Sequence, residues 1–342
     1  MILDFNYTTR CVRWVLSTVL VMLLATAARA DYRAHPEAVA FIDELVSDHG
    51  FARDQLEQWL SHAQRQQNIL DAIARPAERV RSWKEYRPIF VVPLRVNNGV
   101  AFWQEHQEAL ARAEQKYGVP AEVVVAIIGV ETNYGRNMGS HRVIDALATL
   151  AFDYPPRAPF FRSELKNYLL LTREHEQNPL DFKGSYAGAM GYGQFMPSSY
   201  RHYAVDFDGD GFADIWNNPV DAIGSVANYF SVHGWRPGEP VLFRARQQDS
   251  AKEGALKTAD MNRIDPPSTS LAVWRERGLE PILPLPDDTP AQALQLEGSF
   301  GEEFWFGTQN FYVITRYNRS HMYALAVYQL SQEIKTAMEA VE

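Results

Sequence analysis

The sequence predicts an α+β protein that is mainly helical and carries a small antiparallel β-rich lobe. Apolar residues recur at helical spacing over much of the first 235 residues. Short segments in which apolar and polar residues alternate, such as 241–246, are confined to the region after residue 236. The chain has 342 residues and is 46% hydrophobic, which allows two or three lobes with a sizeable core and excludes a disordered protein.

The first thirty residues are typical of a secretory signal peptide. Two arginines precede the apolar stretch 14–28, and small residues at positions 28 and 30 predict cleavage before Asp31. The apolar stretch is short for a membrane span, and an uncleaved anchor is the alternative. The only cysteine, Cys11, lies ahead of the apolar stretch, so it cannot carry a lipid at the cleavage point. We therefore expect a periplasmic protein with no disulfide and no thiol nucleophile.

An N-terminal helical lobe is predicted over 31–117. Two amphipathic helices are expected between residues 31 and 67, with a break at Gly50, and a further helix over 100–117. The proline-punctuated segment 75–93 is expected to form a turn and a docking segment.

The next region, 118–235, contains most of the chemistry. The run 123–128 is rich in β-branched residues and could be a strand, but Pro120 is typical of a helix start and no turn follows until Asn133. We therefore predict a buried helix, and further helices over 143–152, 160–174 and 220–230.

Glu131 ends this apolar run. Loss of hydration disfavours the charged form of a carboxyl group and raises its pKa. A carboxylic acid that is still protonated near neutral pH can donate a proton to a leaving oxygen. The alternative is a helix-end glutamate with its carboxylate in water.

The segment 183–200 alternates glycines with aromatic and small residues. Glycine allows a backbone to approach a ligand closely, and aromatic and amide side chains can contact sugar rings and their hydroxyl groups. This composition favours a ligand cleft over the alternative, a tight-turn loop packed under neighbouring helices.

The segment 206–211 has aspartates at positions 1, 3 and 5 and glycine at position 6, as a calcium loop of EF-hand type begins. Position 12 is Asn217, where a bidentate glutamate is expected, so a later carboxylate would have to close the site. A solvated acidic turn is the alternative. The expected ligands are Asp206, Asp208, Asp210, the carbonyl oxygen of Phe212, and Asp221.

The remaining chain is expected to form a β-rich lobe over 236–318 and a C-terminal helix over 319–342 that packs on the helical lobe. Segments 241–246, 270–275 and 304–315 are the expected strands, joined by the proline-rich loop 281–290. The formal net charge of −9 argues against a nucleic-acid partner, which would require a basic face.

Three blocks of sequence (131–135, 188–198 and 221–230) closely resemble the membrane-bound lytic transglycosylase B family, also known as glycoside hydrolase family 103. The likeness extends from residue 31 to the C-terminal helix and includes 315–318. The resemblance implies a lysozyme-like core and cleavage of the β-1,4 bond between N-acetylmuramic acid and N-acetylglucosamine in peptidoglycan. It also implies a product with a 1,6-anhydro ring.

The resemblance assigns roles to individual residues. Glu131 would be the only catalytic acid/base, assisted by the acetamido group of the substrate. A structural calcium ion, in a loop longer than an ordinary EF-hand, is implied, and no organic cofactor. Glycan strands are the expected partner, cell-wall synthesis or division proteins are candidate partners, and a monomer is expected. The implied substrate-binding residues are Ser185, Gln194, Phe195, Tyr229, Tyr317, Tyr323, Tyr86 and Arg157.

Three other functions remain open from the sequence. Ordinary glycosidases use two carboxylates, and Asp145 and Asp153 are the candidates for a second one, which would make the protein a lysozyme-type hydrolase. The chain could also be a non-catalytic cell-wall binding protein or a secreted calcium-binding module.

Overall fold

The computed structural model describes residues 32–74, 81–248 and 261–341. The predicted signal peptide at 1–30 lies outside the described residues. Among the helices that are described, none combines the length and the apolar character needed to cross a membrane.

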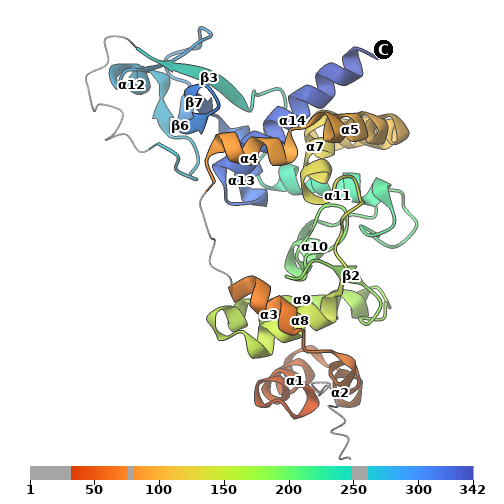
Figure 1. The fold of residues 1–342 in the computed structure, drawn as a ribbon. Coiled ribbons are helices and arrows are strands. Elements are labelled where there is room, and N and C mark those ends of the chain that lie inside the picture. Colours follow the sequence, from red (N-terminus) through yellow and green to blue (C-terminus); the bar gives the residue numbers. More distant parts are fainter. Residues whose placement is uncertain (1–31, 75–80, 249–260, 342) are drawn as a thin grey trace, which may run out of the picture.

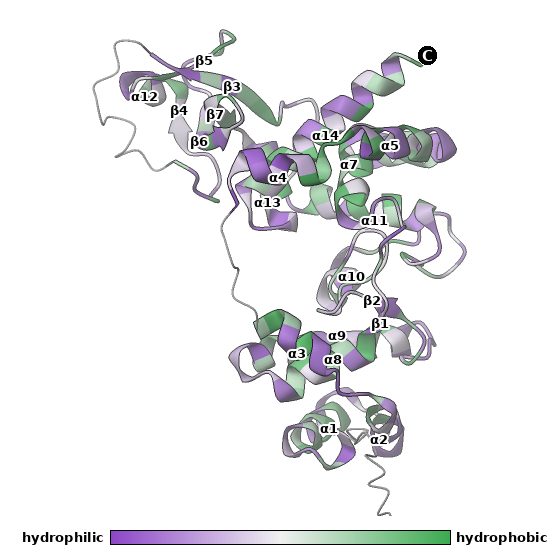
Figure 2. Cartoon of the chain, in the orientation of Figure 1, coloured by the Kyte–Doolittle hydropathy of each residue, from purple (hydrophilic) through white to green (hydrophobic). Residues whose placement is uncertain are grey.

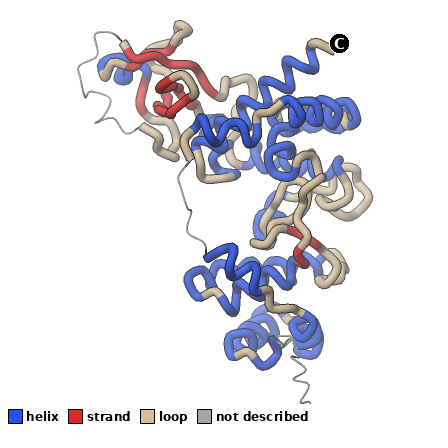
Figure 3. The backbone as a smooth tube through the Cα atoms, viewed as in Figure 1, coloured by secondary structure: helices blue, strands red, loops and turns tan. Residues whose placement is uncertain are grey.

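Helices dominate the described chain, and strands form one small sheet and a two-stranded ribbon (Figures 1 and 3). The α-helices are α1 (Pro36–His49), α2 (Arg53–His62), α3 (Gln67–Ala74), α4 (Trp83–Phe90), α5 (Pro93–Glu105), α6 (Gln107–Tyr117), α7 (Ala121–Thr132), α8 (Val143–Asp153), α9 (Ala158–Glu174), α10 (Pro197–Tyr203), α11 (Pro219–Val232), α12 (Leu271–Glu276), α13 (Gln309–Tyr317) and α14 (His321–Glu339). The 3₁₀ helices are η1 (Tyr32–Ala34) and η2 (Pro155–Arg157). The strands are β1 (His141–Arg142), β2 (Lys183–Gly184), β3 (Leu242–Gln247), β4 (Thr269–Ser270), β5 (Leu279–Pro281), β6 (Pro290–Gly298) and β7 (Gly301–Gly307).

The N-terminal helices lie in two places. Helices α1 and α2 contact η1, and α3 contacts α8, so these helices lie at one end of the molecule with α8 and α9 (Figure 1). Helices α4 and α5 contact α14, and α6 contacts α7 and α11. The C-terminal helix α14 therefore packs against α4, α5 and α7, in the half of the molecule that also holds the sheet. The division of the chain into lobes stays a prediction.

Helix α7 is the buried centre of this half. Every residue of α7 except Glu131 is buried, and Figure 2 shows the helix as a hydrophobic element surrounded by other helices. Gly129 is required for this packing, because a Cβ atom there would lie 2.5 Å from the hydroxyl of Tyr134. The prediction of a buried helix over 123–128 is confirmed. Burial on all sides outweighs the β-propensity of its valines and isoleucines.

The main sheet is antiparallel, with strand order β4-β6-β7-β3-β5. One face, which includes Phe304 and Phe306, packs with Trp274 of α12 in a small core of its own. The other face, which includes Leu294 and Trp305, joins the main core. The mainly helical α+β fold with a small antiparallel sheet is confirmed.

Several element boundaries differ from the prediction. Of the expected strands, 270–275 lies mostly in helix α12, and 304–315 begins in strand β7 but continues into helix α13. The expected helix 100–117 is divided at His106 into α5 and α6. Short apolar runs do not distinguish strand from helix by period alone. The expected turn over 75–93 contains α4, whose start is fixed by a capping box between Ser82 and Glu85.

Candidate functional site

The C-terminal end of α7 places Glu131 at the centre of the candidate site. The helix ends because Asn133 and Tyr134 both take left-handed backbone conformations, with φ of 50° and 60°. The hydroxyl of Thr132 donates to the carbonyl of Tyr192 at 3.0 Å and accepts from the amide of Gly135 at 3.0 Å. These bonds join the end of α7, next to Glu131, to the glycine- and tyrosine-rich loop.

The carboxyl group of Glu131 lies in an environment that favours its neutral form. Burial raises its pKa from 4.5 to about 7. A hydrogen bond of 2.6 Å from the Tyr323 hydroxyl to Oε1 acts in the opposite direction and lowers the pKa. Near neutral pH this group therefore exists in both protonation states, as a group that gives and then recovers a proton requires.

Three tyrosines surround Glu131 and come from separate helices. Burial raises the pKa of Tyr86, Tyr317 and Tyr323, and the negative charge of Glu131 raises each of them further. Tyr86 lies on α4, Tyr317 on α13 and Tyr323 on α14. These phenols stay protonated at all physiological pH values, so they can act only as hydrogen-bond donors or acceptors and as apolar surface.

Phe195 and Tyr229 extend this aromatic cluster. The ring of Tyr317 lies 6.0 Å from that of Phe195 and 4.8 Å from that of Tyr229, between ring centroids. The Tyr317 hydroxyl donates to the Gly193 carbonyl at 2.5 Å, and the Tyr229 hydroxyl donates to the Arg316 carbonyl at 2.7 Å. The structure thus unites five of the predicted site residues with Glu131, namely Tyr86, Phe195, Tyr229, Tyr317 and Tyr323.

Gln194 and Ser185 hold the glycine-rich loop in shape. Gln194 has a φ of 51°, and its side-chain amide donates to the carbonyls of Gly191 at 2.9 Å and Met138 at 3.3 Å. The hydroxyl of Ser185 accepts from the amide of Ala189 at 3.0 Å. Both side chains are half-buried, so the structure gives them a local role and leaves their contact with substrate as a prediction.

Arg157 lies apart from this cluster. It is exposed in η2, between α8 and α9, and its guanidinium lies over the rings of Phe160 and Phe161, at 4.6 and 5.1 Å from their centroids. Within residues 32–74, 81–248 and 261–341, no contact joins Arg157 to Glu131. Its assignment to substrate stays a prediction.

Sequence reasoning missed one buried carboxylate that positions the site. Glu164 of α9 is 4% exposed and accepts bonds from the amide and hydroxyl of Ser198, at 2.9 and 2.7 Å. It therefore anchors the first turn of α10, directly after the loop that carries Gln194 and Phe195. A glutamate on the apolar face of the predicted helix 160–174 is the signal that could have revealed it.

The two candidates for a second carboxylate have structural partners elsewhere. Asp145 is 4% exposed, forms an ion pair with Arg142 at 2.8 Å and accepts from the amide of Gln64 at 2.9 Å. Asp153 accepts from the hydroxyl of Tyr32 at 2.6 Å. Neither carboxylate is among the causes of the Glu131 pKa shift. Both belong to the packing of the N-terminal helices against α8.

Four carboxylates form a cluster that could hold a metal ion. One oxygen from each of Asp206, Asp208, Asp210 and Asp221 lies within 4.8 Å of the others. Backbone amides of the loop, first that of Gly211, lower the pKa of Asp206. An all-oxygen donor set of this kind suits a hard divalent cation.

Asp221 anchors the acidic loop to α11. It is fully buried and accepts bonds from the amides of Phe207 at 2.7 Å and Asp214 at 2.9 Å. The carbonyl of Phe212 accepts from the amide of Asp214 at 2.9 Å, which leaves its second lone pair for another partner. The side-chain amide of Asn218 donates to Asp208 at 2.7 Å and to Asp221 at 3.2 Å. The group of four matches the predicted carboxylate set, and the part played by Phe212 stays a prediction.

Comparison with known proteins gives a family match and a curated relative. A family described as "Transglycosylase SLT domain" matches residues 33–332. The curated relative is the membrane-bound lytic murein transglycosylase B of Escherichia coli (strain K12). It is 46% identical over 316 residues, which are 90% of this chain and 85% of the relative.

Solved structures agree with this chain in fold. The soluble lytic transglycosylase SltB1 of Pseudomonas aeruginosa matches with a TM-score of 0.84 and 56% identity, covering 88% of this chain and 99% of that one. The Escherichia coli lytic transglycosylase Slt35, solved in complex with calcium, matches with a TM-score of 0.82 and 47% identity, covering 90% of this chain and 95% of that one. SltB3 of Pseudomonas aeruginosa, solved in complex with NAG-anhNAM-pentapeptide, matches with a TM-score of 0.77 and 33% identity, covering 87% of this chain and 78% of that one.

Proposed function

Because this chain belongs to the transglycosylase SLT domain family, we propose that it cleaves the β-1,4 bond between N-acetylmuramic acid and N-acetylglucosamine with Glu131 as the sole acid/base. The chain is a lytic murein transglycosylase with a lysozyme-like core, as its relatives are. The resemblance found in the sequence is confirmed. Our proposal concerns three further points: which bond is cleaved, which product forms and what each residue of the site does.

The observation that carries the proposal is the protonation behaviour of Glu131. Its pKa of about 7 allows a large protonated fraction near neutral pH, as a proton donor to a glycosidic oxygen requires. The aromatic surroundings provide low-polarity walls that exclude water from the reacting atoms.

The reaction follows from one carboxyl group with help from the substrate. Protonated Glu131 donates its proton to the bridging oxygen as the bond between C1 and that oxygen breaks. The oxygen of the 2-acetamido group stabilises C1 from the opposite face. The C6 hydroxyl oxygen of the same sugar then attacks C1, and the Glu131 carboxylate takes the hydroxyl proton. The product is a 1,6-anhydro sugar, no water is consumed, and Glu131 ends protonated as it began.

The aromatic cluster is proposed to hold the glycan next to Glu131. We assign Phe195 and Tyr229, which pack against Tyr317, to the walls of the glycan site, and Tyr86, Tyr317 and Tyr323 to the immediate surroundings of the carboxyl group. The remaining proposed substrate contacts are Ser185, Gln194 and Arg157. In support, the relative SltB3 was solved with NAG-anhNAM-pentapeptide, a ligand that contains an anhydro sugar.

The acidic loop is proposed to bind a structural calcium ion through Asp206, Asp208, Asp210, the Phe212 carbonyl and Asp221. The oxygen donor set supports this assignment, as does the calcium complex of the relative Slt35. A bound cation would neutralise carboxylates that otherwise repel one another, and would tie the loop to α11.

We also propose a periplasmic location, because the substrate is peptidoglycan and residues 1–30 have the pattern of a secretory signal. A monomer with five parts is proposed: signal segment 1–30, helical lobe 31–117, catalytic core 118–235, β lobe 236–318 and C-terminal helix 319–342. Cell-wall synthesis or division proteins are candidate partners.

The mass of the released muropeptides tests the proposal. Purified sacculi are digested with the enzyme and with a hydrolytic lysozyme, and the products are compared by mass spectrometry. Products one water lighter than those of the lysozyme are expected. Reducing-end products with the mass of simple hydrolysis would instead assign a lysozyme-type hydrolase, and no soluble product would assign a binding protein.

A further inference from the structure

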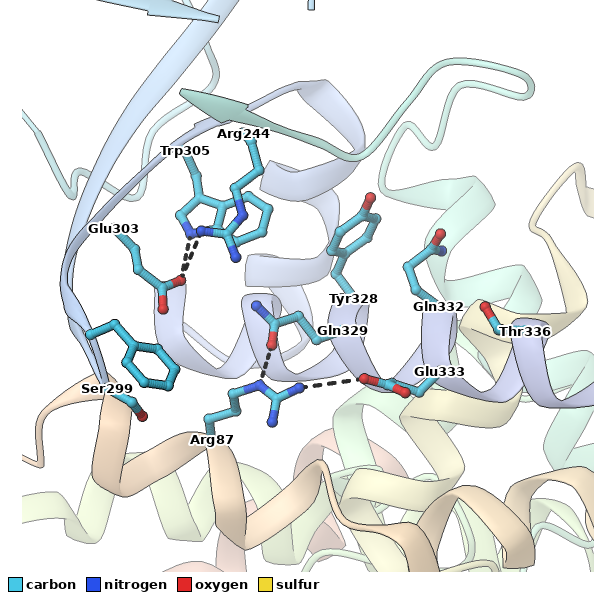
Figure 4. Close-up of a pocket in the computed structure, with 11 residues that line it drawn as sticks. Arg87, Arg244, Ser299, Glu303, Trp305, Tyr328, Gln329, Gln332, Glu333 and Thr336 are labelled. Atoms are coloured by element: carbon cyan, nitrogen blue, oxygen red, sulfur yellow. Dashed lines mark hydrogen bonds and ion pairs between the residues drawn. The ribbon is translucent and has the colours of Figure 1, made fainter. Parts of the chain in front are cut away.

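A groove that does not include Glu131 lies between the sheet and the helices α4 and α14 (Figure 4). It has a volume of about 610 Å³, within the range of about 300–1,000 Å³ that is typical of ligand sites. Glu131 does not line it. On α4, Tyr86 is close to Glu131 while the next residue, Arg87, lines the groove, so the two sites share this helix as a wall.

The charges in the groove cancel. Arg87 forms an ion pair with Glu333 at 3.5 Å and donates to Gln329 at 2.5 Å. Arg244 forms an ion pair with Glu303 at 3.3 Å. Figure 4 shows both pairs among the residues that line the groove. Because each guanidinium already has a carboxylate, the groove does not favour a phosphate or another anion, and its ligand is expected to be neutral.

Neutral polar groups remain available in the groove. Tyr328 is half-buried, and among the described residues its hydroxyl has no hydrogen-bond partner. Gln332 is exposed, and within the part of the chain that the structure describes its side-chain amide makes only a long bond of 3.4 Å, to Ser331. A hydroxyl and an amide can both donate to and accept from the hydroxyl and acetamido groups of a ligand.

Aromatic surface adjoins these polar groups. Phe300 is fully exposed, at 106%, on the two-residue turn of the β6–β7 hairpin, where it makes no contribution to either core. Trp305 is 6% exposed and lies beneath Arg244, with the guanidinium 4.0 Å from the indole centroid, so Phe300 supplies the exposed aromatic face and Trp305 the floor of the groove. An aromatic face beside hydroxyl and amide groups suits a ligand with an apolar face and a polar edge, which is the form of a pyranose ring.

The groove does not suit an extended peptide as well. The strands that line it, β3 and β7, lie inside the sheet, and each is hydrogen-bonded to strands on both sides. Their backbone groups cannot add a strand from a ligand, which is the usual way for a sheet to bind a peptide. Only side chains are available for recognition.

We propose that this groove is a second glycan-binding site, which takes a neutral N-acetylhexosamine segment at a distance from Glu131. It would hold a strand next to the one that is cleaved and so increase residence on an insoluble wall. The identification of the natural glycan as murein rests on the proposed function. The chemical class of the ligand, a neutral N-acetylhexosamine, is argued from the groove alone.

The test uses the full chain with Glu131→Gln, so that binding is read without turnover, and chitotriose as the neutral probe. The indole N–H resonance of Trp305 is followed by NMR and assigned by its loss in Trp305→Phe. A saturable shift is expected, and the double variant Phe300→Ala/Gln332→Ala should abolish it. Leu283→Ala, which removes another exposed apolar side chain from the same lobe, should leave it unchanged.

Two further measurements complete the test. The double variant should need a several-fold higher concentration of sacculi for half-maximal co-sedimentation, with an unchanged melting temperature. The proposal is overturned if chitotriose leaves the Trp305 resonance in place, if the double variant shifts as much as its parent, or if a murein stem peptide shifts the resonance and chitotriose does not. None of these outcomes depends on the cleavage chemistry of Glu131.

Discussion

Glu131 and Asp206 are carboxyl groups that the same chain places in opposite environments. Glu131 ends a buried helix, where loss of hydration raises its pKa to about 7 and one phenol donates to it. Asp206 lies exposed in a loop, where the amides of Gly211, Gly209 and Asp210 donate to it and lower its pKa. The first group keeps a large protonated fraction near neutral pH, and the second is an anion.

The difference shows that donor count and burial together determine what a carboxyl group can do. With burial and a single donor, the neutral acid is stable enough to serve as a proton donor. With several donors and free access to water, the charged form is stable and can bind a cation. Asp221 combines both conditions. It is fully buried, and burial raises its pKa although backbone amides donate to it.

The largest expected effect is on turnover. Glu131→Gln keeps the shape of the side chain but removes the proton that is donated. We expect the rate of muropeptide release from sacculi to fall by about 10²–10⁴-fold, the usual contribution of a general acid. The melting temperature and its response to calcium should stay close to those of the parent, because the acidic loop is untouched. Activity near the parental level would remove Glu131 from the mechanism.

A large effect on folding is expected at the other site. Asp221→Ala leaves the buried amides of Phe207 and Asp214 without an acceptor, and we expect a loss of about 2–3 kcal/mol in the free energy of unfolding. Denaturant unfolding with and without calcium measures it. Asp48→Ala, at an exposed aspartate of α1, is the matched control. Equal losses in the two variants would mean that Asp221 does not anchor the loop.

A calcium titration sharpens the contrast between the two carboxyl groups. Calcium at about 100 times its dissociation constant should stabilise the parent by about 2.7 kcal/mol, and a chelator should reverse the gain. Asp206→Asn should lose most of this response, whereas Glu131→Gln should retain it. The measurement is the melting temperature against calcium concentration. A response that is equal in the parent and in Asp206→Asn would place the ion elsewhere.

The sequence predicted the chemistry of both sites better than their surroundings. Glu131 and three of the four aspartates stand in local patterns, an apolar run that ends in a carboxylate and alternating aspartates before a glycine. Tyr86, Tyr317 and Tyr323 are up to 237 residues apart in the chain, and only the packing of α4, α13 and α14 brings them together. Their grouping came from the family resemblance.

Elements with weak local signals were predicted least well. Helix α13 was taken for a strand because 309–315 is short and mixed, and its identity depends on the cap from Thr308 and on packing against α14. The buried Glu164 was missed because its partner, Ser198, lies 34 residues away. Such contacts are determined by tertiary structure, which neither period nor composition reports.

The smallest effect is a shift in pH dependence caused by Tyr323. The protonated form of Glu131 is the proton donor, so kcat/KM should fall as the pH rises through about 7. The Tyr323 hydroxyl stabilises the carboxylate and so lowers the pKa. In Tyr323→Phe the pKa should therefore rise, and the falling limb should move to higher pH by up to about one unit, the equivalent of about 1.4 kcal/mol.

Stability gives an independent reading of the same proton. The folded state holds the Glu131 proton more tightly than the unfolded chain, so the stability of the parent should decrease as the pH rises from about 4.5 to about 7. Tyr323→Phe should extend that decrease to higher pH, and Glu131→Gln should abolish it. Tyr312→Phe, at a half-buried tyrosine of α13, is the control and should change neither the pH dependence of stability nor the falling limb of kcat/KM. If Tyr323→Phe moves the kinetic limb to lower pH, the phenol does not stabilise the carboxylate. Burial would then be the only influence on this proton.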